Sequence, residues 1–244
     1  METILYFILL ALIAEILGTV GGFGSSVFFV PIASLFFDFY SVLGITALFH
    51  VASNVSKIII FHKGFNKRLI LSMGVPAVLF VIFGAWLSQY INVGVVEILL
   101  SMILISTSLT LLFVKQFAIQ PTLINSMGGG ALSGILAGML GTGGVIRGLT
   151  LAAFGLEKQV FIMTSAIIDL GIDFSRSLVY FSNGYIHRHD LHLVFWLILV
   201  SFVGSYCGKL ILKRVSQEQF KKIVLVFILF TGVFILGQQI LKWL

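Results

Sequence analysis

The sequence predicts an all-α polytopic membrane protein with two inverted-topology repeats, each a re-entrant broken-helix hairpin followed by three transmembrane helices. The first observation is composition. Of 244 residues, 59% are hydrophobic and 10% are charged, and apolar stretches of about 20 residues, the length that crosses a bilayer, recur. The second is a glycine-rich break that interrupts an apolar run twice. The third is the distribution of basic loop residues between the two sides of the membrane. Most of them fall on one side only if the chain has this topology.

The first repeat, residues 1–115, begins with an apolar run at 3–37 that the break Gly18–Ser26 divides into two parts. Each part has roughly 13–15 residues, about 20 Å as a helix, which is too short to cross a hydrocarbon core of about 30 Å. We therefore expect two half-helices that form a re-entrant hairpin. Further apolar runs predict spans at 42–61, 69–90 and 95–114.

The second repeat, residues 123–244, follows a linker at 116–122 and has the same organisation. Gly18, Gly21 and Gly24 of the first break return 120 positions later as glycines of the second. Self-similarity at a fixed spacing indicates duplicated units. We expect a hairpin at 123–155 and spans at 159–181, 191–212 and 223–243.

The basic residues decide between parallel and inverted repeats. If each broken segment crossed the membrane fully, both repeats would point the same way and the basic residues would divide evenly between the two sides. If each is re-entrant, ten basic residues share one side and only Arg188 and Lys242 lie opposite. The positive-inside rule favours the uneven distribution, with both termini outside. The ten are Lys63, Lys67, Arg68, Lys115, Lys158, Lys209, Lys213, Arg214, Lys221 and Lys222.

The second break, Gly138–Gly148, contains five glycines and Arg147. Glycine costs about 1 kcal/mol relative to alanine in a helix, so the cluster predicts that one helix stops and another begins, at about Val145. The free N–H groups of the new helix, with Arg147, favour an anion there. Alternatively, the glycines only permit close helix packing. The candidate substrate contacts are Gly21, Gly22, Gly24, Ser25, Gly141, Thr142, Gly143, Gly144 and Arg147.

Each repeat also has a polar stripe inside a span, spaced i, i+4, i+7 on one helix face. The stripe of the first repeat is His50, Asn54 and Lys57, and that of the second is Asp169, Asp173 and Arg176. Ionisable residues at membrane depth mark substrate or proton paths. Asn54, Lys57 and Arg176 are therefore further substrate candidates, and His50, Asp169, Asp173 and Glu15 are candidates for proton coupling.

Structural alternatives exist for these residues. Asp173 and Arg176 could neutralise each other on one helix, and Arg147 could pair with Asp169 or Asp173. Lys57 could snorkel towards the neighbouring basic loop, and Glu15 could lie near an interface.

Other chemistry has little support in the sequence. His187, His189 and His192 lie in a short loop with Arg188 beside them, which disfavours a metal ion. No nucleophile–base arrangement or phosphate loop is apparent, so we expect no enzyme activity, cofactor or metal. The net charge of +6 reflects topology and not nucleic-acid binding. Cys207, the only cysteine, is expected to be a small buried thiol, and the N-terminus does not resemble a cleaved signal peptide.

The segments GTVGGFGSSVFFVP at Gly18–Pro31 and GMLGTGGVIR at Gly138–Arg147 resemble those of the TauE/SafE family of sulfite and sulfonate exporters. The resemblance covers essentially the whole chain, although Leu151 stands where the family often has a proline. It implies a multi-pass permease of the bacterial inner membrane that moves small sulfur-containing anions, typically outward.

We therefore expect a secondary transporter, an exporter of small anions such as sulfite or organosulfonates, with alternating access around a site near the bilayer midplane. Its partners would be the anion and the lipid bilayer, and a homodimer is left open. The alternatives are an anion uptake permease or channel, and a membrane assembly factor without transport activity.

Overall fold

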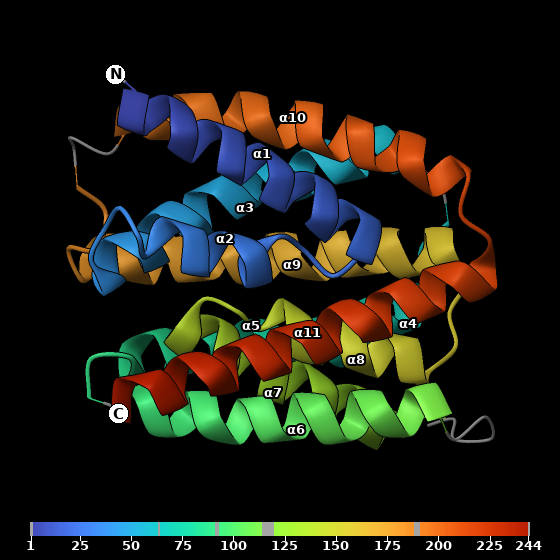
Figure 1. Ribbon diagram of the computed structural model, residues 1–244. Helices are drawn as coiled ribbons and strands as arrows, with labels where there is room; N and C mark the ends of the chain where they lie inside the picture. Colours follow the sequence, from blue (N-terminus) through green and yellow to red (C-terminus); the bar gives the residue numbers. More distant parts are fainter. Residues whose placement is uncertain (1, 63, 91–92, 114–119, 188–190, 244) are drawn as a thin grey trace.

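The structure is a computed structural model that describes residues 2–62, 64–90, 93–113, 120–187 and 191–243, and these form helices joined by short connections (Figure 1). The expected linker at 116–122 and the loops at 91–94 and 183–190 lie partly outside the described residues. The helices are α1 Glu2–Gly21, α2 Ser26–Ala33, α3 Phe39–Phe61, α4 Lys67–Leu69, the π-helical turn η1 Ile70–Gly74, α5 Val75–Leu87, α6 Val93–Phe113, α7 Leu123–Leu140, α8 Gly144–Ala153, α9 Lys158–Ser182, α10 Leu191–Lys213 and α11 Gln217–Trp243.

The arms of each broken segment are unequal, so the expectation of two similar half-helices is wrong. The first arms, α1 and α7, have 20 and 18 residues, about 30 Å and 27 Å as helices. The second arms, α2 and α8, have only 8 and 10 residues. The first arms are therefore long enough to approach full spans, and only the second arms are short.

Gly18 and Gly138 stay within their helices because both pack closely against a neighbour. A Cβ atom at Gly18 would lie 2.4 Å from Ser25 Cα, and one at Gly138 would lie 2.4 Å from Val81 O of α5. For these two glycines the packing alternative is correct. The breaks begin only at Gly22 and Gly141, whose φ angles of 76° and 75° are left-handed and favour glycine.

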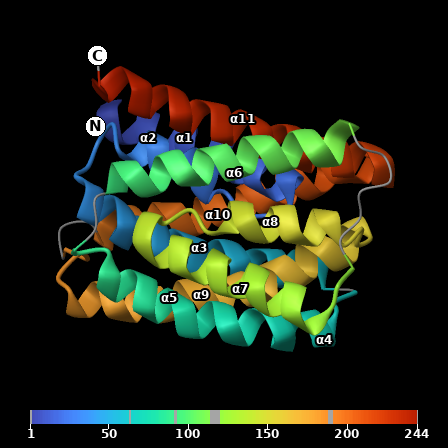
Figure 2. The ribbon, with the colours of Figure 1, turned by 90° about the horizontal axis from the view of Figure 1, so that it is seen from below.

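The two broken segments enter the helix bundle from opposite ends. In Figure 1, α1 runs inward from the end that carries both termini, and α2 returns towards that end. The pair α7 and α8 does the same from the other end, as the views from the side and from below agree (Figure 2). Around them, α5 packs against α7, α6 against α11, α3 against α9 and α1 against α10.

The composition of the helices is that of a multi-pass membrane protein. Six described segments are long and apolar enough to cross a bilayer. They are Ile4–Gly21, Phe39–Phe61, Lys67–Leu87, Leu123–Leu140, His192–Lys213 and Gln217–Leu241. The first arms α1 and α7 belong to this set, whereas α6 and α9, the expected spans at 95–114 and 159–181, do not.

Helix α9 has ample length, 25 residues, but carries charged side chains at its centre.

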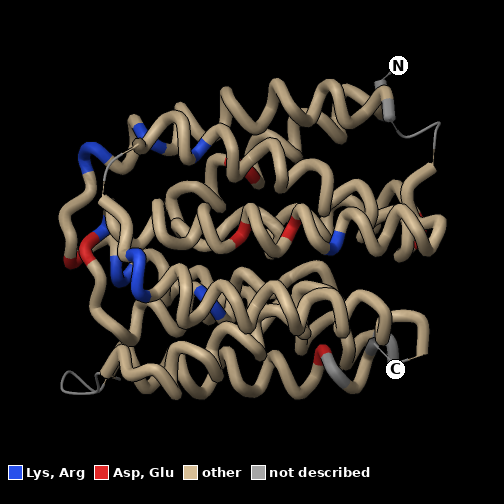
Figure 3. The backbone as a smooth tube through the Cα atoms, turned by 180° about the vertical axis from the view of Figure 1, so that it is seen from behind, with Lys and Arg blue, Asp and Glu red and all other residues tan. Residues whose placement is uncertain are grey.

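Lys and Arg residues gather at the end of the molecule opposite both termini (Figure 3).

Candidate functional site

The two breaks contact each other in the interior of the bundle. A Cβ atom at Gly144, the first residue of α8, would lie 2.3 Å from the carbonyl oxygen of Phe23 in the first break. Arg147, one turn into α8, donates a hydrogen bond from Nη2 to the same oxygen at 3.1 Å. The absence of a side chain at Gly144 therefore allows the second break to lie directly on the first.

A small cavity lies where the breaks meet α3 and α9. Its volume is about 10 Å³, room for roughly one water molecule. Sulfite or a sulfonate is larger, so binding at this point requires the surrounding elements to separate. The lining comes from both breaks and both polar stripes: Phe23, Gly24, Ser26, His50, Ser53, Asn54, Ala137, Gly141, Gly143, Gly144, Asp169, Ile172, Asp173 and Arg176.

One face of α9 presents two carboxylates to two arginines. Asp169 forms an ion pair with Arg147, which is fully buried and also donates from Nε to Ser165 Oγ at 3.0 Å. Asp173 forms an ion pair with Arg176 at 2.7 Å. The alternative kept open for Arg147, a pair with Asp169, is thus present, and Arg147 itself does not line the central cavity.

The same face of α9 caps the C-terminal end of α7. Arg176 Nη1 donates to the carbonyl oxygen of Ala137 at 3.1 Å, and the Tyr180 hydroxyl donates to that of Gly138 at 2.6 Å. These carbonyls belong to the last turn of α7, where backbone donors within the helix run out; Ala137 O also accepts from Gly141 N, the cap residue, at 3.0 Å. Helix α9 thereby fixes where α7 ends and where the break begins.

Helix α3 supplies polar groups that connect the first break to α9. Asn54 Nδ2 donates to Asp173 Oδ2 at 2.7 Å. The His50 ring lies with Nε2 3.1 Å from Ser25 Oγ and Nδ1 3.4 Å from Arg176 Nη2. His50 therefore joins the first break to the charged face of α9.

The remaining members of the polar set, Glu15 and Lys57, form a separate ion pair at 2.8 Å between α1 and α3. Both are buried, so neither snorkelling of Lys57 nor an interfacial Glu15 describes them. The Glu15 carboxylate is also surrounded by hydroxyl donors. They are Ser25 at 2.5 Å, Ser53 at 2.7 Å, Ser205 at 3.0 Å and Thr19 at 3.3 Å.

The buried charges among the described residues balance. Three carboxylates each pair with one cation, and the pairs lie within one connected region. Pairing offsets the high cost of burying isolated charges, so the closed site is stable without a ligand. The members are Glu15, Asp169 and Asp173 with Lys57, Arg147 and Arg176.

The structure brings most, but not all, of the predicted residues to one place. Of the predicted set, Gly24, Gly141, Gly143, Gly144, His50, Asn54, Asp169, Asp173 and Arg176 line the central cavity. The other predicted residues lie beside this cavity or elsewhere. Ser25 hydrogen-bonds to Glu15 and His50, and Gly21 and Gly22 pack against aromatic rings. Thr142 lines a different cavity, and Arg147, Glu15 and Lys57 form ion pairs.

Sequence reasoning missed three groups. Tyr180 continues the α9 stripe four residues after Arg176, and that spacing could have revealed it. The carbonyl of Phe23 is a backbone group that carries no sequence signal, and Ser165 is one of many serines. No group of His, Cys, Asp and Glu suited to a metal ion occurs among the described residues, and His189 of the histidine loop lies outside them.

The family model described as sulfite exporter TauE/SafE matches residues 7–235, nearly the whole chain. The chain belongs to the TauE/SafE family. The match spans both breaks and both polar stripes, so all the elements of the site lie within the region that defines a TauE/SafE protein. Neither a curated protein nor a solved structure matches the chain.

Proposed function

We propose that this TauE/SafE protein is a secondary transporter that exports small anions such as sulfite or organosulfonates by alternating access around the central cavity. One observation carries the proposal: two helix breaks from opposite ends of the bundle meet at a cavity lined by paired charges. Discontinuous helices that meet at mid-depth are typical of secondary transporter sites.

The proposal includes inverted repeats in a bacterial inner membrane, with the basic end in the cytoplasm. The opposite entry of the two hairpins supports the inversion (Figure 1). The gathering of Lys and Arg at the end away from the termini supports the orientation (Figure 3). Inverted repeats provide two conformations of similar energy that open to opposite sides, which is what alternating access requires.

The anion would bind at the beginning of α8. The first turn of this helix has no side-chain cap, and two hydrogen bonds there are long. Val145 N to Thr142 O and Arg147 N to Gly143 O are both 3.4 Å. These N–H groups and the helix dipole favour a negative charge. Arg147 Nη1 is buried and has no hydrogen-bond partner among the described residues, so one donor of the guanidinium is available.

An incoming anion would compete with the carboxylates for the arginines. Arg147 is held by Asp169 and Arg176 by Asp173. A sulfonate or sulfite presents the same kind of oxygen acceptors as a carboxylate and suits the guanidinium fork. The resident carboxylates thus keep the empty site closed, and the substrate replaces one of them as the carrier opens.

The charge balance predicts how the membrane potential acts. The empty site is neutral when all six charged groups are ionised, so a monovalent anion such as hydrogensulfite or a sulfonate gives the loaded site one negative charge. An inside-negative potential then favours outward movement by about 2.3 kcal/mol per 100 mV. If Asp169 or Asp173 takes up a proton with the anion, the loaded site is neutral and the potential has no effect on it. Export without proton uptake is therefore favoured by the potential itself.

The test is flux in proteoliposomes that contain the purified protein. We expect counterflow of labelled sulfite or an alkanesulfonate, and little counterflow of acetate. An inside-negative potential should also accelerate the net outward flux of the transported anion. Gly128→Ala serves as a folded control, because a side chain there meets nothing within 4 Å. A channel would pass net anion current without counterflow, and an assembly factor would give neither.

A further inference from the structure

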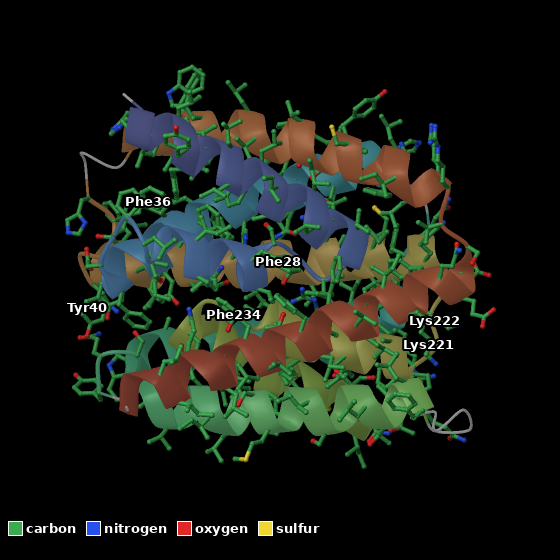
Figure 4. The ribbon with its side chains drawn as sticks, viewed as in Figure 1. Phe28, Phe36, Tyr40, Lys221, Lys222 and Phe234 are labelled. Carbon is green, nitrogen blue, oxygen red and sulfur yellow. The ribbon has the colours of Figure 1, made fainter. Side chains whose placement is uncertain are left out.

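Two larger cavities lie at opposite ends of the molecule. The cavity at the terminal end, between α2, α6 and α11, has a volume of about 780 Å³, and that at the basic end, between α8, α9 and α11, about 380 Å³. In Figure 4 these ends are marked by Tyr40 and Phe36 on one side and by Lys221 and Lys222 on the other. We call them the terminal-end and basic-end cavities.

The two cavities use equivalent positions of the two repeats. Three residues that line the terminal-end cavity, Leu35, Glu97 and Leu100, have counterparts 120 positions later in the basic-end cavity. The counterparts are Gly155, Gln217 and Phe220. The same spacing relates the glycines of the two breaks, so part of each cavity is built from equivalent positions of the two repeats.

The terminal-end cavity reaches the second break. Thr142 lines it, while the residues on either side, Gly141 and Gly143, line the central cavity. The Thr142 hydroxyl is buried and has no hydrogen-bond partner among the described residues. A buried hydroxyl without a partner costs free energy, so it marks a point where a polar ligand or water is accommodated.

The basic-end cavity stops at two aromatic rings. Phe161 and Phe220 line it and pack edge to face, with ring centroids 5.3 Å apart. Both rings press on Gly22 of the first break, where a Cβ atom would lie 2.9 Å from Phe220 and 3.0 Å from Phe161. Gly22 is followed by Phe23 and Gly24, which line the central cavity. The ring pair therefore stands between the basic-end cavity and the site.

We propose that Phe161 and Phe220 form the closed basic-side gate of the transport path, and that the terminal-end cavity is its opposite mouth, with Thr142 as the first polar contact for the anion. This inference rests on the proposed transport function. The structure is then a closed state whose terminal side is the more nearly open of the two, because the terminal-end cavity reaches the break at Thr142. The alternate conformation requires the two rings to leave Gly22, which happens when the first hairpin moves relative to α9 and α11.

The equivalent positions on the terminal side lack this pair. Val42 and Leu100 stand at those positions, 119 residues before Phe161, which is the offset between the polar stripes of α3 and α9, and 120 residues before Phe220. Val42 is buried in a cluster with Phe7 and Phe29. The side chains over Gly141 of the second break are aliphatic: a Cβ atom there would lie 3.1 Å from Leu43 and 3.4 Å from Val30. The aromatic pair packs a larger apolar area over its break than these aliphatic side chains can, which explains why the basic side is the closed one.

Accessibility of a cysteine in the central cavity tests the gate without any assumption about the substrate. Ser26, which lines that cavity, is replaced by cysteine in a Cys207→Ser background. A membrane-impermeant thiol reagent is then applied to right-side-out and inside-out vesicles. Labelling from the terminal side should exceed labelling from the basic side. Phe161→Ala and Phe220→Ala should each raise basic-side labelling by about tenfold, since a minor open state becomes well populated.

Phe174→Ala on α9 and Phe230→Ala on α11 are matched controls, because these rings are exposed on the same helices. If the alanine variants do not fold, Phe220→Leu takes their place, because it retains an apolar side chain. Leucine is the residue at the equivalent terminal-side position, Leu100. Unchanged basic-side labelling in folded gate variants would overturn the gate. Altered labelling with no anion counterflow would support the gate and refute transport of the tested anions, so the two failures are distinguishable.

Discussion

Neutralising Asp169 tests whether Arg147 acts on the substrate or only holds the fold. Asp169 is the carboxylate that pairs with Arg147, and an anion that binds this arginine must displace it. Asp169→Asn removes the competing charge and leaves Arg147 in place. We therefore expect the variant to bind the transported anion more tightly than the wild type, whereas a purely structural ion pair predicts no gain.

The magnitude follows from the contact that is removed. Hydrogen bonds to charged groups contribute about 1.5–3 kcal/mol, and each 1.4 kcal/mol is a factor of ten, so the affinity should rise by roughly 10- to 100-fold. Arg147→Gln should lose binding, and it leaves Asp169 buried without its partner at a cost of about 3–5 kcal/mol in stability. The double variant Arg147→Gln/Asp169→Asn should recover stability but not binding.

The assay is anion affinity in detergent, measured by calorimetry after each variant is shown to be monodisperse and folded. Glu15→Gln is the matched control. It frees Lys57 in the same way, but that pair does not line the central cavity. Unchanged or weaker anion binding in a well-folded Asp169→Asn protein would refute the competition mechanism and make the pair structural.

Three further predictions concern the break, the topology and a helix cap. Gly144→Ala should abolish anion counterflow, because the new Cβ atom would lie 2.3 Å from Phe23 O, whereas Gly128→Ala should leave flux intact; equal flux in both would mean that contact between the breaks is unnecessary. In a Cys207→Ser background, cysteines that replace Phe65 and Lys222 should be labelled from one side of the membrane, and a cysteine that replaces Tyr40 from the other side. Labelling of positions 65 and 222 from different sides would exclude inverted repeats. Asp38 caps α3 and accepts hydrogen bonds from Tyr40 N at 3.1 Å and Ser41 N at 3.2 Å. The hydrogen bond from Ser41 Oγ is the main reason that its pKa lies below the ordinary value of 3.8. Asp38→Ala should therefore destabilise the protein by about 1 kcal/mol at pH 7. In thermal unfolding in detergent, the stability difference between wild type and variant should shrink as the pH falls below 3.8 and through the lowered pKa of Asp38. A stability difference independent of pH would show that the charge of the cap is irrelevant.

The sequence determined the features that depend on local pattern. Hydropathy indicated a multi-pass membrane protein because a long apolar helix satisfies its own backbone polar groups in lipid. The recurrence of the Gly18–Ser26 break after 120 positions located both interruptions. The i, i+4, i+7 spacing placed Asp169, Asp173 and Arg176 on one face of a helix, and this face does line the cavity.

The tertiary structure decided the partners and the lengths of the arms. Gly18 and Gly138 do not end their helices, because close packing on Ser25 and Val81 offsets the roughly 1 kcal/mol that glycine costs in a helix. That compensation depends on a neighbouring element and is invisible in the local sequence. The pairing of Arg147 with Asp169, and of Glu15 with Lys57, likewise depends on which helices lie side by side. Spacing alone placed these charges at membrane depth, whereas the packing of the breaks against α3 and α9 determined which charge neutralises which.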